Sequence, residues 1–118
     1  MGVKTTRAPR SDFIIVTTPT VPNYRVKMVL DVVTGLTART RGVGGKFVAG
    51  IQSMIGGEVS AFTSEIEKAR VEALERMKDR ARQLGANAVV GLDIETSDVL
   101  QGTVLISATG TAVVIEPE

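Results

Sequence analysis

Hydrophobic and polar positions change their spacing several times along the chain, and each change marks a predicted element. From Phe13 the run Phe-Ile-Ile-Val-Thr-Thr is apolar and β-branched, which predicts a buried strand that ends before two prolines. From Tyr24 apolar and polar side chains alternate, which predicts a long half-buried strand. We expect this second strand to run towards Arg41, with a bulge or bend at Gly35. One side of the alternation consists of Tyr24, Val26, Met28, Leu30, Val32 and Thr34.

Two helices are predicted in the middle of the chain. The glycines from Gly42 break the extended pattern, and apolar residues then recur every three or four positions, which predicts a short helix over residues 43–55. A longer helix begins between residues 58 and 64 and stops at Gly85. Its acidic side chains gather near the start and its basic ones near the end, as the helix dipole favours. The apolar stripe of this helix consists of Val59, Phe62, Ile66, Ala69, Ala73, Met77, Ala81 and Leu84.

Two further strands complete the predicted α+β fold. After Gly85, the residues Ala88, Val90, Leu92 and Ile94 form the apolar side of an alternating strand, and a turn is expected over residues 97–102. Residues 103–115 are rich in Val, Ile and Thr and predict the last strand. The order β-β-α-α-β-β predicts a two-layer subunit, with the long helix on a mainly antiparallel sheet.

The predicted sheet lacks enough helices to cover it. Small residues at positions 108, 110 and 112 leave room for something to pack closely, which is either the long helix of the same subunit or a neighbouring subunit. Four strands and one long helix also leave a sheet face or edge exposed unless chains associate. We therefore expect a homo-oligomer with the strands at its centre.

Composition limits the class of protein. A chain of 118 residues forms one domain, and its net charge of +1 gives no large field to attract nucleic acid or an anionic membrane. Residues 1–12 are polar and are expected to form a disordered tail before a single folded domain over residues 13–118. With neither a leader nor an apolar run of about 20 residues, the chain is expected to be cytoplasmic, with no nucleic acid or membrane as partner.

The chain contains no histidine and no cysteine, so imidazole and thiolate are missing both as catalytic groups and as ligands for copper or zinc. Oxygen ligands remain, and Asp93, Glu95 and Asp98 form the acidic cluster outside the helices. They are candidate ligands for a hard cation. The alternative is a solvated strand end or a subunit contact with a basic partner.

A second candidate site lies where glycines and basic residues precede the short predicted helix. Backbone N–H groups in such a segment can bind an anion or a small ligand. A phosphate-binding P-loop would need glycine at position 40 and Ser or Thr at position 47, where this chain has Thr40 and Phe47, and a dinucleotide motif starting at position 42 would also need glycine at 47. The alternative is a structural turn. The candidate ligand-binding residues are Arg39, Arg41, Gly42, Gly44, Gly45 and Lys46.

Four ordered blocks over residues 13–116 resemble the YbjQ-like family of small prokaryotic proteins, mostly of unknown function. The blocks are Val-Thr-Thr-Pro-Thr-Val-Pro-Asn-Tyr, then Arg-Gly-Val-Gly-Gly-Lys-Phe with Ile-Gly-Gly-Glu, then Leu-Gly-Ala-Asn-Ala-Val-Val-Gly-Leu, and Ala-Thr-Gly-Thr-Ala-Val. The resemblance implies a dodecin-like α+β subunit, assembly into a ring of five subunits, and a family label of heavy-metal binding. That label conflicts with the absence of thiolate and imidazole ligands.

The sequence favours a ring-forming protein that binds a small anion, another small ligand or a hard cation at subunit interfaces without catalysis. The alternative is a carboxylate-dependent hydrolase, in which Asp93 and Glu95 would act as general acid and base. No motif identifies a specific reaction or a cofactor.

Overall fold

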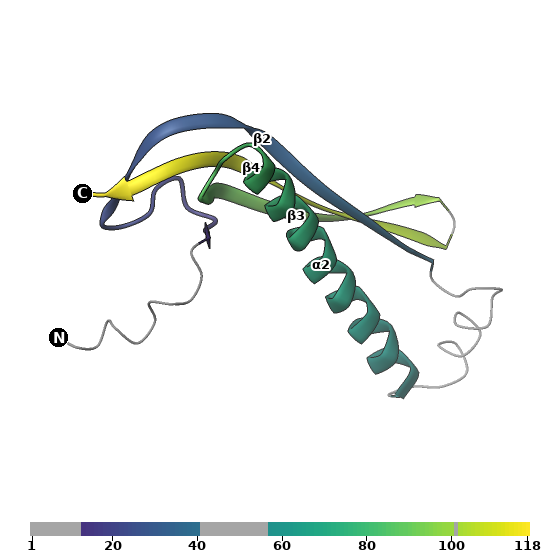
Figure 1. The fold of residues 1–118 in the computed structure, drawn as a ribbon. Helices are drawn as coiled ribbons and strands as arrows, with labels where there is room; N and C mark the ends of the chain where they lie inside the picture. Colours follow the sequence, from purple (N-terminus) through teal and green to yellow (C-terminus); the bar gives the residue numbers. More distant parts are fainter. Residues whose placement is uncertain (1–12, 41–56, 101) are drawn as a thin grey trace.

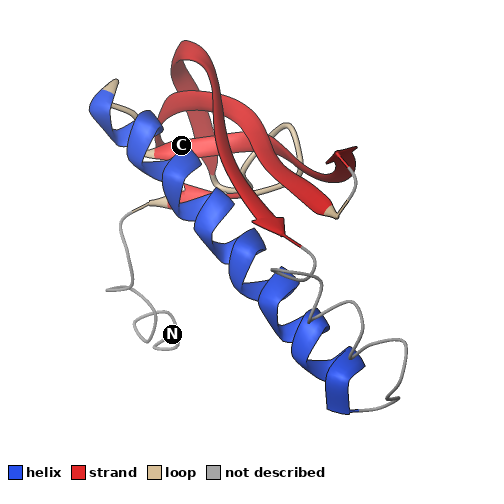
Figure 2. Cartoon of the chain, turned by 90° about the vertical axis from the view of Figure 1, so that its right-hand side faces the viewer, coloured by secondary structure: helices blue, strands red, loops and turns tan. Residues whose placement is uncertain are grey.

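The computed structural model describes residues 13–40, 57–100 and 102–118. One helix packs on a four-stranded mixed sheet in two layers, which confirms the α+β class (Figures 1 and 2). The strand order is β1-β3-β4-β2, with β1 parallel to β3 and the other pairs antiparallel. The predicted tail over residues 1–12 and the predicted helix over residues 43–55 lie outside the described residues. The elements are β1 (Ile14–Ile15), β2 (Tyr24–Thr40), α2 (Gly57–Gln83), β3 (Ala88–Leu100) and β4 (Thr103–Pro117).

The helix α2 runs from Gly57 to Gln83, so it begins one residue before the predicted range of starts and ends two residues before Gly85. At its C-terminus the N–H of Ala86 donates to the carbonyl of Ala81 at 3.0 Å, and the N–H of Gly85 donates to the carbonyl of Arg82 at 2.9 Å. This pair of hydrogen bonds is a Schellman motif, and Gly85 adopts the φ of 95° that the motif requires. The chain therefore turns directly from α2 into β3.

The helix packs against β2 and β4 through small side chains. The alanine and methionine side chains of the predicted stripe are fully buried, and they contact buried residues of both strands. The hydroxyl of Thr37, on β2, donates to the carbonyl of Ala69 at 3.0 Å. Ala108 and Ala112 lie in the same core, so the helix of the same subunit fills the space that these small residues leave. The contacting set is Ala69, Ala73, Met77 and Ala81 on α2 with Val33, Ile106, Ala108 and Ala112 on the sheet.

The closest approach of helix and sheet occurs at Gly35, where a bulge or bend was predicted. That prediction is wrong, because Gly35 pairs regularly with Ala108. A Cβ at position 35 would instead clash with the backbone of Ala73 and Met77, so glycine is required for close packing. The irregularities in the pairing of β2 with β4 lie earlier in the strand, between Val26 and Met28 and between Val29 and Asp31.

These two bulges disturb the alternation of β2 only over the residues between them. Val33 and Thr37 face the helix and are buried, whereas Val32 on the other side is 63% exposed. Each bulge adds a residue and reverses the phase, so the second bulge restores the phase that the first one reverses. Val26 and Val32 therefore lie on the same side, as predicted, and the predicted alternation is wrong only between the bulges, where Val29 takes that side.

A third irregularity divides the apolar side predicted for β3. The pairing of β3 with β4 shifts between Val90 and Asp93, where Gly91 has a φ of 67°. Ala88 and Val90 consequently pack on the face away from α2, while Ile94 packs towards the helix-side core. The predicted turn over residues 97–102 is also too long, because β3 continues to Leu100 and β4 begins at Thr103.

The N-terminal strand is shorter and less buried than predicted. β1 comprises two half-buried residues that pair with the start of β3. The segment after it covers a second apolar cluster, on the face of the sheet away from α2. Asn87 supports this end of the sheet, since its side chain donates to the carbonyl of Ile115 at 2.9 Å and accepts from the N–H of Ile115 at 2.8 Å. The buried members of the second cluster are Val21, Ala88, Val90, Val113 and Ile115.

We predict that Gly35→Ala destabilises the fold by about 1–3 kcal/mol, because the helix must move away from β2 to admit one methyl group. The measurement is the midpoint of urea unfolding. The control is Val71→Thr at an exposed position of α2, which should change the free energy of unfolding by less than about 0.5 kcal/mol. Equal midpoints for the two variants would contradict the close contact.

Candidate functional site

The described end of the predicted anion-binding segment is occupied by ion pairs. Arg39 Nε lies 3.3 Å from a carboxylate oxygen of Glu65, and Arg39 Nη1 lies 3.3 Å from a carboxylate oxygen of Glu72. Arg39 also donates to the carbonyl of Ala38 at 3.2 Å, so it links β2 to α2. The other five candidates, Arg41, Gly42, Gly44, Gly45 and Lys46, lie outside the described residues, and the anion site stays a prediction.

The three acidic candidates on β3 are not brought together. Asp93 and Glu95 pair with Thr109 and Ser107 of β4, on the face away from α2. Asp98 pairs with Val104, whose side chain lies in the helix-side core, so its carboxylate belongs to the opposite face. Within residues 13–40, 57–100 and 102–118, no group of three or more carboxylates is positioned to hold a metal ion.

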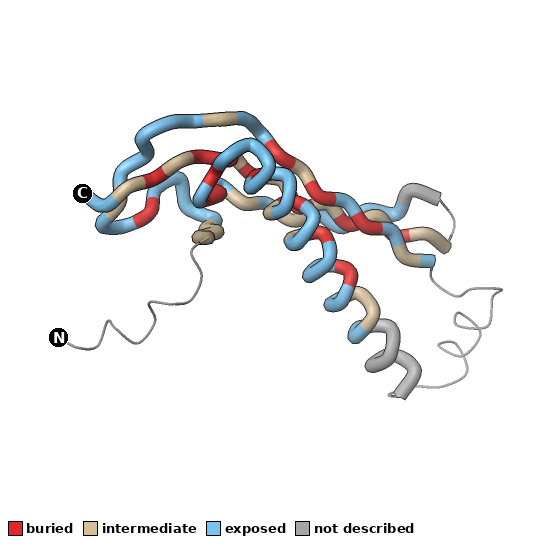
Figure 3. The backbone as a smooth tube through the Cα atoms, in the orientation of Figure 1, coloured by how far each residue is buried: buried red, intermediate tan, exposed pale blue. Residues whose placement is uncertain are grey.

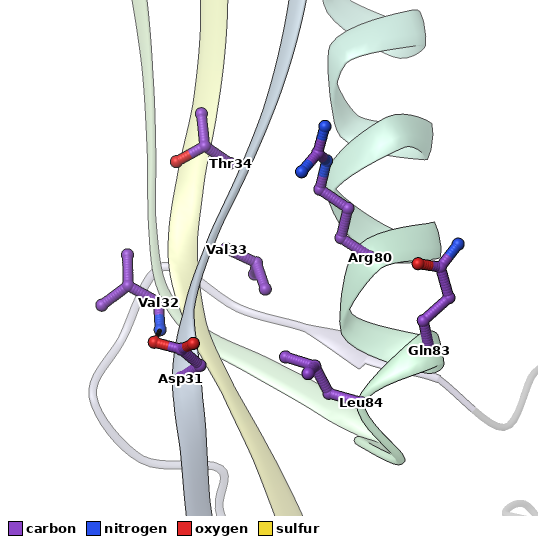
Figure 4. Close-up of a pocket in the computed structure, with 7 residues that line it drawn as sticks. All are labelled: Asp31, Val32, Val33, Thr34, Arg80, Gln83 and Leu84. Carbon is purple, nitrogen blue, oxygen red and sulfur yellow. Dashed lines mark hydrogen bonds between the residues drawn. The ribbon is translucent and has the colours of Figure 1, made fainter.

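A cleft with a volume of about 400 Å³ opens between β2 and the C-terminal end of α2 (Figure 4). The bulge before Asp31 and the helix end at Gln83 lie at its lower end. In Figure 4 the side chains of Arg80, on α2, and Leu84, directly after the helix, extend towards β2, and Val33 extends from β2 towards the helix. The cleft is lined by Asp31, Val32, Val33, Thr34, Arg80, Gln83 and Leu84.

Arg80 is the most distinctive charge in this cleft. The other described arginines, at positions 25, 39, 70, 76 and 82, each form an ion pair with a carboxylate. Arg80 forms none with any residue in the described part of the chain. The carboxylate of Asp31 accepts a hydrogen bond of 2.8 Å from the N–H of Val32, and in Figure 4 it turns towards that backbone group. The cleft thus offers a guanidinium and an amide to a small polar ligand.

This cleft was not predicted from the sequence. In the sequence, Arg80 resembles any basic residue in the last turn of a helix. The helix dipole favours a positive charge at that end, so no ligand is needed to account for the arginine. The cleft depends on the bulge before Asp31, and no proline or glycine marks that position. The one available signal for the bulge is that apolar and polar residues do not keep a single alternating phase over the whole strand.

Next to the cleft, β2 exposes an apolar surface. In the part of the chain that the structure describes, β2 carries five exposed large hydrophobic side chains, and Val29 is 65% exposed. Figure 3 shows β2 exposed along most of its first half. Four of these residues pair with β4 residues on the face away from α2, and we call this group the β2 stripe: Val26, Val29, Val32 and Leu36. Val32 belongs to both the stripe and the cleft.

None of the described helix residues forms a segment long and apolar enough to cross a membrane.

A family model and individual relatives assign the chain to the same family. Residues 13–116 match the YbjQ family, described as "Putative heavy-metal-binding". A "UPF0145 protein" of Methanocella arvoryzae is 43% identical over 107 residues, which cover 91% of this chain and 89% of the relative. A UPF0145 protein of Saccharolobus islandicus is 43% identical over 105 residues, covering 89% and 92%.

A solved structure supports the fold. The crystal structure of a protein of unknown function from Pediococcus pentosaceus, assigned to the DUF74 family, superimposes with a TM-score of 0.61. The match covers 90% of this chain and 100% of that protein, at 18% identity. At this identity the likeness concerns the fold alone.

Arg39, on β2, and Arg80, on α2, should differ in how much each contributes to the free energy of unfolding. We predict that Arg39→Gln lowers the free energy of unfolding by about 1 kcal/mol, because it removes two partly exposed ion pairs. Arg80→Gln should change it by less than about 0.5 kcal/mol, since no ion pair with the described residues is lost. Chemical denaturation measures both values, and a larger loss for Arg80→Gln would contradict the assignment of an unpaired cleft arginine.

Proposed function

Because the chain belongs to the YbjQ family, we propose that it is a cytoplasmic, ring-forming homo-oligomer of five subunits that binds a small ligand between its subunits. We favour ligand binding without catalysis over the alternative function, that of a carboxylate-dependent hydrolase. Asp93 and Glu95 do not line the cleft, and the one carboxylate that does, Asp31, is engaged by a backbone N–H. The cleft contains no pair of side chains arranged as acid and base or as nucleophile and base.

The donor set does not fit the heavy-metal label of the family. The whole sequence lacks cysteine and histidine, which supply the ligands that heavy and borderline-soft ions prefer. Asp93 and Glu95 share one face of β3, whereas Asp98 belongs to the other, so a single subunit offers two carboxylates there. A hard cation at this position would require acidic side chains from several subunits.

One observation carries the proposal: the exposed β2 stripe and the cleft share an edge of the subunit. Val32 lines the cleft and is also 63% exposed within the stripe. A neighbouring subunit placed against β2 would remove this apolar surface from water and would also close the open side of the cleft. Such a site would be complete only in the assembled protein.

The chemistry of the cleft favours a ligand with an anionic group. Arg80 supplies a positive charge without a protein partner among the described residues, and a guanidinium binds carboxylate or phosphate through two parallel hydrogen bonds. Gln83 adds an amide group that can hydrogen-bond a ligand. Val33 and Leu84 provide an apolar wall on which the rest of a small molecule can pack.

The test is native mass spectrometry of the protein purified without denaturation. We expect a small molecule bound at a fixed ratio to subunits, and we expect Arg80→Gln to reduce its occupancy at least tenfold by removing the charge that holds it. The matched control is Arg70→Gln, which removes an arginine of the same helix that pairs with Glu67 and does not line the cleft. Undiminished occupancy in Arg80→Gln, with the oligomer intact, would refute the cleft as the binding site.

A further inference from the structure

The second half of the β2 edge is closed to another strand. The N–H of Val32 already donates to the carboxylate of Asp31 at 2.8 Å. Arg76 Nη1 reaches over from α2 and donates to the carbonyl of Leu36 at 2.5 Å. Side chains that occupy backbone groups in this way blunt a sheet edge against pairing. The part of this edge strand that carries no such side chain–backbone bond is residues 24–30.

At the opposite edge of the sheet, β3 is covered only in its first part. The N–H of Val16 donates to the carbonyl of Val89, and the N–H of Leu92 donates to the carbonyl of Val16, each at 3.0 Å. Beyond Leu92, no described strand lies on the outer side of β3, which leaves residues 93–98 as an open edge.

The two open segments carry opposite charges. Residues 93–98 of β3 contain three acidic side chains and no basic one, whereas residues 24–30 of β2 contain Arg25 and Lys27 and no acidic one. Arg25 is paired with Glu116 of its own subunit. Lys27, Asp93 and Glu95 form no ion pair with any residue of the described ranges, so their charges are available to a neighbour.

We propose that residues 93–98 of β3 in one copy of this chain dock against residues 24–30 of β2 in the next copy, with Lys27 facing the acidic pair Asp93 and Glu95. The inference rests on the proposed association of subunits and names the surfaces that form it. Because the two edges lie on opposite sides of the sheet, each copy uses one edge for each neighbour. Repetition of such a head-to-tail contact closes into a ring.

Two further features fit this contact. Both bulges of β2 lie within or beside residues 24–30, and a bent strand rotates each copy relative to the last, as a closed ring requires. The contact also lies directly beside the cleft residues 31–34, so the neighbouring copy would reach the open side of the cleft. Self-pairing of two β2 edges would instead bring basic segments together, which is unfavourable.

Charge exchange tests the proposal. Lys27→Glu and Glu95→Lys should each weaken subunit association about tenfold or more per contact, because an attractive pair becomes a repulsive one. The matched control is Glu75→Lys on α2, which changes the net charge as Glu95→Lys does at a residue that belongs to neither open edge and pairs with Lys78, and it should leave assembly unchanged. Oligomer size is measured by native mass spectrometry, with circular dichroism to confirm folding.

The decisive samples are the combinations. The double variant Lys27→Glu with Glu95→Lys in one chain should assemble again, and a mixture of the two single variants should form oligomers containing both chains, because each acidic β2 edge meets a basic β3 edge. Loss of assembly in Lys27→Glu alone, with Glu95→Lys unaffected, would indicate β2 self-pairing and overturn the inference while leaving an oligomer. A monomeric wild-type protein would overturn the proposed ring as well.

Discussion

The structure depends on the close contact between α2 and the middle of β2. Glycine at position 35 and the alanines of the helix stripe allow the two backbones to approach, and the core forms at this contact. The same contact also determines which parts of the sheet the helix leaves uncovered. Because the helix lies over β2 and β4 and barely touches β3, one edge of the sheet and the face away from the helix keep exposed positions. The unusual surface of this protein is therefore a consequence of its core.

Much of this arrangement could be predicted from the sequence where one local pattern determines the structure. The helix stripe has a single period, and Gly85 allows only a left-handed stop, so the helix and its end were predicted closely. The phase of the strands could not be predicted. Four pairing shifts in β2 and β3 change which residues share a face, and three of these shifts lie among side chains without a glycine. The register of a strand depends on the strand with which it pairs, and the local sequence carries no information about that partner.

The candidate site shows the same limit. Arg39 was a reasonable anion ligand by sequence, yet two carboxylates of α2, far from it along the chain, neutralise its charge. Asp93, Glu95 and Asp98 form one cluster by sequence and two faces in the strand. The cleft around Arg80 forms where the C-terminal end of α2 packs beside a bulge of β2. This tertiary contact joins segments far apart in the sequence, so a local pattern does not predict it. Exposed apolar residues lie beside a cleft in which Arg80 pairs with no described carboxylate, and our proposal that the functional unit is larger than one chain is based on this combination.

Sedimentation velocity at micromolar concentration tests this central claim most directly. The account predicts one species several times heavier than the 12.5 kDa chain, with a mass that stays at a fixed multiple over a tenfold dilution. A single species at 12.5 kDa that remains folded and soluble would contradict it, because the exposed β2 stripe would then need no partner.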